Sequence, residues 1–355
     1  MTKDKMPSGI KNPFDALKLV RRNIIEMKPY SSARDEFKGE AEVFLDANEN
    51  PYPTPYNRYP DPLQWKVKEK LSAVKSVDPE HIFLGNGSDE AIDLLIRAFC
   101  EPNQDSIVTT DPTYGMYAVC AELNAVSLIK VPLAGDFDLD ADAMLNAIQG
   151  NTKLIFLCSP NNPTGNLLSE SKILRILENF NGIVVIDEAY IDFTQHDSFT
   201  TKLNEYSNLV VLQTFSKAWG LAGLRLGMAF ADKAIINVLN KIKYPYNINT
   251  QTQDIALKAL AEIEAKDKAV AEILEQRAAL AASLEKLRIT EAVYPSDANF
   301  LLIKVKNAPD TYQYLMNRKI IVRDRSKVTL CKDCLRITVG TPLENKNLIA
   351  ALEKL

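Results

Sequence analysis

The chain has 355 residues, of which 46% are hydrophobic and 25% are charged, and its formal net charge is −4. These proportions are those of a soluble globular protein, and they exclude a fibre or an intrinsically disordered chain. The acidic balance also argues against a nucleic-acid partner, because a phosphate backbone requires clustered lysine and arginine. The length exceeds that of one typical core, so we expect a large domain and a smaller one.

Hydropathy and the few histidines and cysteines further restrict the class of protein to which the chain can belong. No stretch approaches the ~18 consecutive apolar residues of a membrane helix, and residues 1–12 lack the apolar centre of a secretory signal. We therefore expect a cytoplasmic protein without a membrane partner. The only histidines, His81 and His196, leave few candidates for a metal site or a histidine-assisted nucleophile. Cys331 and Cys334 have CxxC spacing but no second pair and no nearby histidine, so we interpret all five cysteines as free thiols and expect no metal.

The first predicted unit is an N-terminal arm, residues 1–45, which we expect to contribute to the smaller domain. A short helix is predicted over residues 14–27. The arm leads into a stretch with prolines at positions 51, 53, 55, 60 and 62, which forbid regular structure.

Residues 46–248 are predicted to form the large domain, an α/β unit with a mostly parallel sheet flanked by helices. Short apolar runs alternate there with helical periodicity, as in parallel sheets joined by crossover helices. The expected strands are 82–84, 107–109, 126–131, 154–158, 183–186, 209–213 and 226–231. The spacing of Ala91, Leu94, Leu95 and Ala98 predicts an amphipathic helix over 88–100, with Ser88 as its N-cap.

Residues 249–355 are predicted to form the smaller, α+β domain. The stretch 250–287 is rich in alanine, leucine, glutamate and lysine and lacks glycine and proline, so it favours one long helix or two consecutive ones. Strands at 299–305, 320–323 and 335–339, a helix near 310–318 and a last helix after Pro342 complete the tail.

The residues that suggest chemistry follow the predicted strands, where ligands sit in open parallel sheets. Lys217 comes directly after the hydroxyl residues Thr214 and Ser216, just past the strand 209–213, and Asp187 follows the strand before it. Alone, a lysine is usually a solvated surface charge and an aspartate a turn or cap residue. Together they match pyridoxal 5′-phosphate (PLP), which needs an amine for a Schiff base and an anion beside its pyridine nitrogen.

The other groups that PLP requires also have candidates. Tyr190 and Asn162 can donate to its phenolic oxygen, and Thr214, Ser216 and Arg225 can bind its phosphate. Asn162 lies in a Pro-Asn-Asn-Pro turn, whose simpler interpretation is a tight loop.

Two further features can each be interpreted either as part of a ligand site or as ordinary packing. The loop 85–89 precedes the helix that begins near Ser88, and a helix N-terminus presents free N–H groups to an anion. A turn of this kind serves close packing about as often as it serves ligand binding. Tyr114 can stack on a pyridine ring or belong to the core.

These motifs give the chain an end-to-end resemblance to fold-type I PLP-dependent transferases, and more narrowly to the histidinol-phosphate aminotransferases of the class-II branch. The motifs are LDANENPYP (45–53), NRYP (57–60), GNGSDE (85–90), SPNNPTG (159–165), VIDEAY (185–190), TFSKAWGLAGLRLG (214–227), SDANF (296–300), IIVRDR (320–325) and CLRITVGT (334–341). Trp219 and Met228 depart from the expected pattern without touching the proposed chemistry.

The resemblance implies a PLP aminotransferase of histidine biosynthesis, acting on histidinol phosphate, glutamate and 2-oxoglutarate. Lys217, Asp187 and Tyr190 would be catalytic, with PLP bound by these three and by Ser88, Asp89, Tyr114, Asn162, Thr214, Ser216 and Arg225. Tyr59 would reach the cofactor of a second subunit, which makes the protein a homodimer by analogy. Tyr30, Asn48, Arg323 and Arg336 would bind the substrate, although surface salt bridges are the simpler interpretation of both arginines.

Four rival functions have to be weighed. An aromatic or branched-chain aminotransferase, or a threonine-phosphate decarboxylase, would share the same cofactor residues. A PLP-binding transcriptional regulator would need a DNA-binding module, for which ~45 residues before the first motif are too few. A catalytically dead scaffold would have lost one of the cofactor residues, and none is missing from the sequence.

Overall fold

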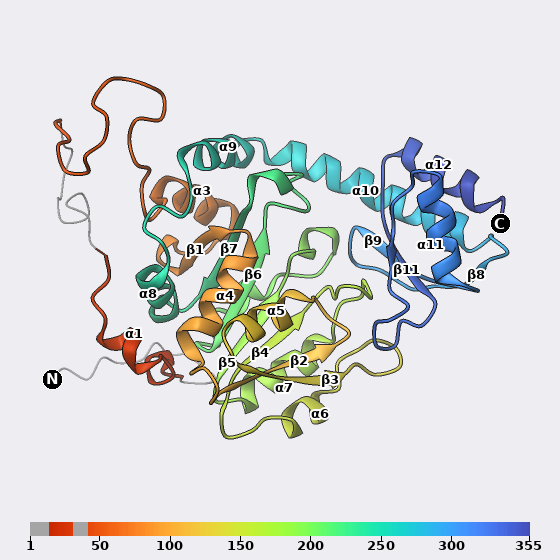
Figure 1. Ribbon diagram of the computed structural model, residues 1–355, viewed down its shortest axis with the longest axis horizontal. Coiled ribbons are helices and arrows are strands. Elements are labelled where there is room, and N and C mark those ends of the chain that lie inside the picture. Colours follow the sequence, from red (N-terminus) through yellow and green to blue (C-terminus); the bar gives the residue numbers. More distant parts are fainter. Residues whose placement is uncertain (1–13, 31–41) are drawn as a thin grey trace.

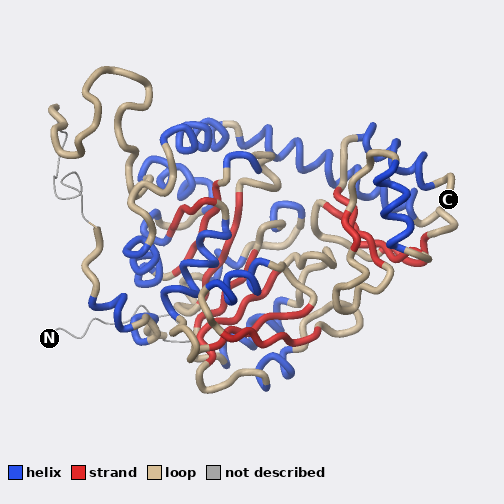
Figure 2. The backbone as a smooth tube through the Cα atoms, in the orientation of Figure 1, coloured by secondary structure: helices blue, strands red, loops and turns tan. Residues whose placement is uncertain are grey.

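The computed structural model describes residues 14–30 and 42–355, and it is built on two separate β-sheets (Figures 1 and 2). The larger sheet has seven strands in the order β1-β7-β6-β5-β4-β2-β3. Its strands are β1 (Ile82–Asn86), β2 (Ser106–Asp111), β3 (Ser127–Pro132), β4 (Thr152–Cys158), β5 (Ile183–Asp187), β6 (Leu209–Thr214) and β7 (Leu226–Ala231). β7 is antiparallel to both of its neighbours, and the other pairs are parallel.

Helices cover both faces of this sheet, which explains why its central strands are continuous apolar runs. Every residue of β5, β6 and β7 is buried, as expected for strands with both faces covered. One core cluster contains Val184 and Ile186, and the other contains their neighbours Ile183 and Val185, because successive side chains point to opposite faces. The covering helices are α3 (Trp65–Lys75), α6 (Ala141–Asn146), α7 (Glu170–Asn179) and α9 (Thr250–Ala261) on one face, and α4 (Ser88–Phe99), α5 (Met116–Leu123) and α8 (Lys233–Ile242) on the other.

The smaller sheet is antiparallel and has the order β10-β11-β9-β8. Its strands are β8 (Thr290–Val293), β9 (Phe300–Val305), β10 (Arg323–Asp324) and β11 (Cys334–Thr338), and its helices are α11 (Ala308–Asn317) and α12 (Pro342–Leu352). Asn307 caps α11, and Thr341 forms a capping box with Glu344 at the start of α12. The long helix α10 (Ile263–Leu284) runs from the side of the larger sheet to this unit (Figure 1).

Short 3₁₀ turns complete the described chain. They are η1 (Ala16–Lys18), η2 (Pro79–His81), η3 (Ile191–Phe193), η4 (Phe199–Lys202) and η5 (Ala222–Leu224). Among the described residues, no helix combines the length and the apolar character needed to cross a membrane.

The predicted fold class is confirmed, as are all seven strands of the larger sheet, and 250–287 forms two consecutive helices. The prediction that Ser88 is the N-cap of α4 is wrong. Gly87, with φ of +74°, holds that position, and Ser88 is the first helical residue. The strand predicted at 320–323 is reduced to Arg323 and Asp324.

The arm differs from its prediction. Its expected single helix is split into η1 and α1 (Arg22–Glu26), because Arg21 is extended and its backbone N–H donates to the carbonyl of Ala98. Ala16, Val20 and Ile24 pack into the core of the larger sheet, whereas we expected the arm to join the smaller domain. Residues 1–13 and 31–41 of the arm lie outside the described residues. The domain limits at 45 and 248 stay predictions, and the packing of Ala256 and Leu260 against the larger core favours a later limit, within α10.

Candidate active site

A cavity of about 840 Å³ lies where β4, β5 and β6 end, and residues of the β10–β11 hairpin form its opposite wall. All but three of the predicted site residues line it. They are Ser88, Asp89, Tyr114, Asn162, Asp187, Tyr190, Thr214, Ser216, Lys217, Arg225, Arg323 and Arg336. The volume suits a small-molecule site, since such cavities measure about 300–1,000 Å³.

Lys217 projects into this cavity from the turn that follows β6. Its Nζ lies 5.6 Å from the ring centroid of Tyr190. Burial, reinforced by the positive charge of Arg336, lowers the pKa of Lys217 below its ordinary value. A larger share of this side chain is therefore the neutral amine, which is the form that reacts with an aldehyde.

Asp187 ends β5 and is almost fully buried at the base of the cavity. Its Oδ2 accepts a hydrogen bond of 2.8 Å from the hydroxyl of Tyr117, and its Oδ1 accepts one of 3.1 Å from the backbone N–H of Ala189. Burial raises the pKa of Asp187 to about 6, even though these two donors oppose the rise. The carboxylate is therefore suited to a cationic partner such as a protonated ring nitrogen.

Asn162 connects the two walls of the cavity. Its Nδ2 donates to the hydroxyl of Tyr190 over 3.3 Å, and its Oδ1 accepts a hydrogen bond from Nη1 of Arg336. The amide is thereby held in one orientation, and the Tyr190 hydroxyl, which accepts from this amide, donates to no side chain among the described residues. Its proton is available for an oxygen atom in the cavity.

The opposite end of the cavity is shaped for an anion. The first turn of α4 opens into it, and its N-cap is Gly87, which has no side chain to cap the helix. Such a helix end can present its backbone N–H groups to an anion. Thr214 donates to Ser216 over 3.0 Å, and Nη2 of Arg225 lies 3.3 Å from Oδ2 of Asp89. Arg225 is half-exposed and adopts a left-handed backbone with φ of +53°.

Comparisons with known proteins decide the family. Residues 42–352 match the model of the class I and II aminotransferases. The histidinol-phosphate aminotransferase of Cytophaga hutchinsonii is 58% identical over 344 residues, which cover 96% of this chain and 99% of that protein. This chain belongs to the histidinol-phosphate aminotransferases of the class I and II aminotransferase family.

Solved structures of this family have the same fold. The histidinol-phosphate aminotransferase of Clostridium acetobutylicum superposes with a TM-score of 0.77 at 24% identity, covering 84% of this chain and 90% of its own. The enzyme of Sinorhizobium meliloti, solved in complex with PLP, gives 0.75 at 23% identity and covers 84% and 82%.

The residues of the cavity fit the PLP of the aminotransferase family. Gly227 keeps the turn before α4 open, because a Cβ added there would lie 2.1 Å from the backbone nitrogen of Ser88. A Cβ on Gly87 would likewise lie 2.6 Å from Nη2 of Arg225. These glycines let β7, Arg225 and the helix end meet around one small space, which is lined by the donors that a phosphate requires.

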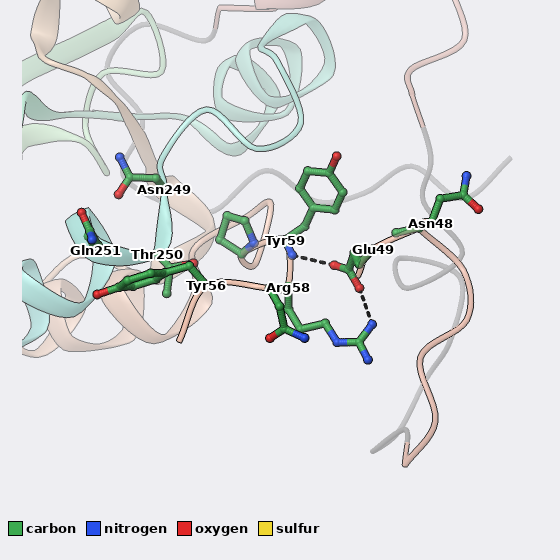
Figure 3. A pocket seen from close by; sticks show the side chains of 11 residues that line it. Asn48, Glu49, Tyr56, Arg58, Tyr59, Asn249, Thr250 and Gln251 are labelled. Atoms are coloured by element: carbon green, nitrogen blue, oxygen red, sulfur yellow. Dashed lines mark hydrogen bonds and ion pairs between the residues drawn. The ribbon is translucent and has the colours of Figure 1, made fainter. Parts of the chain in front are cut away.

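Three predicted residues lie elsewhere. Tyr59 and Asn48 line a second cavity of about 550 Å³, and Figure 3 shows Glu49 hydrogen-bonded there to Arg58 and to the backbone of Tyr59. The ring of Tyr59 stacks on Tyr246 with centroids 4.5 Å apart. Tyr30 is 68% exposed and lines neither cavity. None of the three therefore contacts the Lys217 cavity of its own chain.

The structure adds two residues that were not among the sequence-based candidates. Tyr117 was hidden because it sits inside a helix where core packing is the default, and only its contact with Asp187 marks it. Arg325 lines the cavity beside the two predicted arginines. Its position two residues after Arg323 could have indicated this, because such residues share one face of a strand.

Proposed function

We propose that this protein is the PLP-dependent aminotransferase that moves an amino group from L-glutamate to imidazole-acetol phosphate, giving 2-oxoglutarate and L-histidinol phosphate in histidine biosynthesis. The observation that carries the proposal is the convergence of Lys217, Asp187 and the Asn162–Tyr190 pair in one cavity whose far wall holds Arg323 and Arg336. The family assignment supports the same reaction.

PLP, when bound, supplies an electron sink for the bond that loses its proton. Asp187 would keep the ring nitrogen protonated, and Asn162 and Tyr190 would donate to the phenolic oxygen. Ser88, Thr214, Ser216, Arg225 and the N-terminus of α4 would bind the phosphate, with Asp89 orienting Arg225 and Tyr114. The hydroxyl of Tyr114 donates to Oδ1 of Asp89 over 3.0 Å, which fixes the ring at the cavity wall.

Lys217 would have two roles in sequence. Its depressed pKa first makes the amine available to hold the cofactor covalently. With a substrate amine in its place, the same Nζ would take the proton from the carbon that bears the substrate's amino group and deliver it to the cofactor.

The substrate would bind between Lys217 and the β10–β11 hairpin. Arg336 reaches Asn162 from this hairpin, so a guanidinium group stands beside the donors of the cofactor's phenolic oxygen. Arg323 lies directly across the strand pair from Arg336. In this proposal the two arginines bind the phosphate or carboxylate of the substrate, whereas Tyr30 and Asn48 lie outside the cavity of their own chain.

A homodimer would bring Tyr59 to the cofactor of the partner subunit. Exposed apolar side chains near Tyr59 support an interface there, since Leu45 is 87% exposed, Tyr52 76% and Tyr244 79%. The partner would also cover the Tyr59 cavity, which shares no lining residue with the Lys217 cavity. We place the reaction in the cytoplasm, because all five cysteines are buried free thiols, as is usual in a reducing compartment.

A half-reaction experiment tests this function. The PLP-loaded enzyme is mixed in separate samples with histidinol phosphate, phenylalanine and threonine phosphate, without an acceptor, and the cofactor's absorbance is followed. We expect rapid conversion to the amine form with histidinol phosphate and slow conversion with phenylalanine. A preference for phenylalanine, or release of carbon dioxide from threonine phosphate, would show that the substrate assignment is wrong.

A further inference from the structure

Three arginines lie on one face of the β10–β11 ladder. Arg323 is the direct cross-strand partner of Arg336. The ladder continues past β10, because the backbone N–H of Arg325 donates to the carbonyl of Cys334 over 2.8 Å. Residues two apart in an extended strand point to the same side, so Arg325 joins the other two, and all three line the Lys217 cavity.

This arrangement carries no compensating charge within the described part of the chain. None of the three arginines forms an ion pair there, and the one side-chain hydrogen bond among them runs from Arg336 to the neutral Asn162. Like charges directly opposite on neighbouring strands destabilise a sheet. Such a cluster therefore indicates a bound anion that neutralises it.

The carboxylates of the same cavity are already engaged. Asp187 accepts from Tyr117, Asp89 pairs with Arg225, and Asp111 accepts from the hydroxyl of Thr329. Asp324 lies on the alternate side of the strand, where it accepts from Ser326. The part of the chain that the structure describes thus offers the arginine cluster no anion.

Arg325 is the member of the cluster with the clearest unmet requirement. Its Nε is buried and has no hydrogen-bond partner among residues 14–30 and 42–355. An unsatisfied buried donor is costly, and that cost is larger when the donor is charged. Burial, reinforced by the positive charge of Arg323, lowers the pKa of Arg325. Arg325 lines the same cavity as Lys217 and Tyr190.

We propose that Arg325 is a third substrate-binding arginine, which binds the phosphate group of the substrate and gives the site its preference for a phosphomonoester over a carboxylate. A phosphate dianion carries two charges and three acceptor oxygens, so it can engage the Nε–Nη edge of Arg325 in addition to Arg323 and Arg336. A carboxylate, with one charge and two oxygens, neutralises less of the cluster. This inference rests on the proposed aminotransferase function.

The test uses the PLP-loaded enzyme and three amine donors: histidinol phosphate, its dephosphorylated form histidinol, and glutamate. Arg325→Gln is expected to raise the KM for histidinol phosphate about 10- to 100-fold, the range for loss of a charge-assisted hydrogen bond, with little change in kcat. The KM for histidinol should stay within about threefold of wild type. Arg325→Lys should recover part of the loss, because it keeps the charge but not the planar fork.

Lys332→Gln is the matched control, because it removes one positive charge from the same hairpin at an exposed position that does not line the cavity. It should leave all three KM values unchanged. Inorganic phosphate gives a second readout: as a competitor of glutamate, it should inhibit Arg325→Gln about 10-fold less strongly than wild type.

The outcomes separate this inference from the function on which it rests. If wild type does not react with histidinol phosphate, the proposed function fails. If wild type reacts but Arg325→Gln has unchanged KM values, or loses histidinol phosphate and histidinol equally, the role of Arg325 is contradicted. A normal half-reaction of the variant with glutamate shows that it is folded and loaded.

Discussion

The hydroxyl of Tyr117 donates a hydrogen bond of 2.8 Å to Oδ2 of Asp187, and both residues are almost completely shielded from solvent. Tyr117 is held in place by Phe156, whose ring stacks on it with centroids 5.0 Å apart. Burial alone would favour the neutral acid at Asp187. The tyrosine therefore helps keep charged the one carboxylate that can pair with the pyridine nitrogen.

Tyr117→Phe should shift the pH dependence of PLP binding. Loss of a hydrogen bond to the charged form raises the pKa of Asp187 above its value of about 6. The loss is worth about 1.5–3 kcal/mol, or roughly one to two pH units. The cofactor's dissociation constant, measured by fluorescence from pH 5 to 9, should begin to rise below about pH 6 in wild type and at correspondingly higher pH in the variant.

Tyr114→Phe is the control for this measurement, because it also removes a hydroxyl, but one that donates to Asp89. For Tyr114→Phe, the pH at which PLP binding weakens should match that of wild type. Identical midpoints for Tyr117→Phe and wild type would show that Tyr117 does not govern the charge of Asp187.

Asp187→Asn should stabilise the cofactor-free protein at neutral and alkaline pH. The pKa of Asp187 is about 6 when folded and 3.8 as its ordinary value. The folded state therefore binds more protons between these values, and its free energy of unfolding falls as the pH rises through them. The Asp187→Asn variant does not suffer this fall in the free energy of unfolding. It should therefore be more stable than wild type by at most about 3 kcal/mol at pH 8 and by about half of that at pH 5.

Urea unfolding of the two cofactor-free proteins at both pH values measures this difference. Glu188, whose pKa burial raises to about 7, contributes equally to both proteins and cancels. A difference that does not grow with pH would count against a buried, ionised Asp187. With PLP bound, the same variant should turn over orders of magnitude more slowly, because the ring nitrogen has lost its charged partner.

Subunit mixing tests whether Tyr59 acts across an interface. Lys217→Ala and Tyr59→Ala are each expected to be nearly inactive at limiting PLP. In a hybrid dimer one site would combine Lys217 of one chain with Tyr59 of the other, so equal mixing after dissociation should restore about a quarter of wild-type activity. If Tyr59 served its own chain's site, no hybrid site would be intact and the activity would stay at the level of the single variants.

The sequence alone predicts those site residues whose positions follow from the strand or turn in which they lie. Asp187 ends β5, and Asn162 and Lys217 lie a few residues after β4 and β6. Each of these strands has a buried apolar run, and parallel strands that end at one edge bring such residues together. For this reason most of the predicted cofactor site lines a single cavity. The cap of α4 was misassigned because Gly87 can adopt a positive φ that makes a side-chain cap unnecessary.

Long-range packing explains what the sequence did not reveal. The arm helix is interrupted at Arg21, whose side chain also pairs with Glu101 over 3.3 Å, a contact between segments 80 residues apart. The roles of Tyr117 and Arg325 depend on which side chains meet across elements, and no local pattern encodes such meetings. The position of Tyr59 relative to a cofactor depends on a second chain.

The most direct test of the account is to locate the lysine that carries the cofactor. The PLP-loaded protein is reduced with borohydride, digested and mapped by mass spectrometry, with Lys217→Ala and the exposed Lys332→Gln treated in parallel. We predict the phosphopyridoxyl group on Lys217 in wild type and in Lys332→Gln, and neither the label nor the visible absorbance of lysine-bound PLP in Lys217→Ala. A label on another lysine of the wild-type protein, or near-normal turnover by Lys217→Ala, would contradict the account.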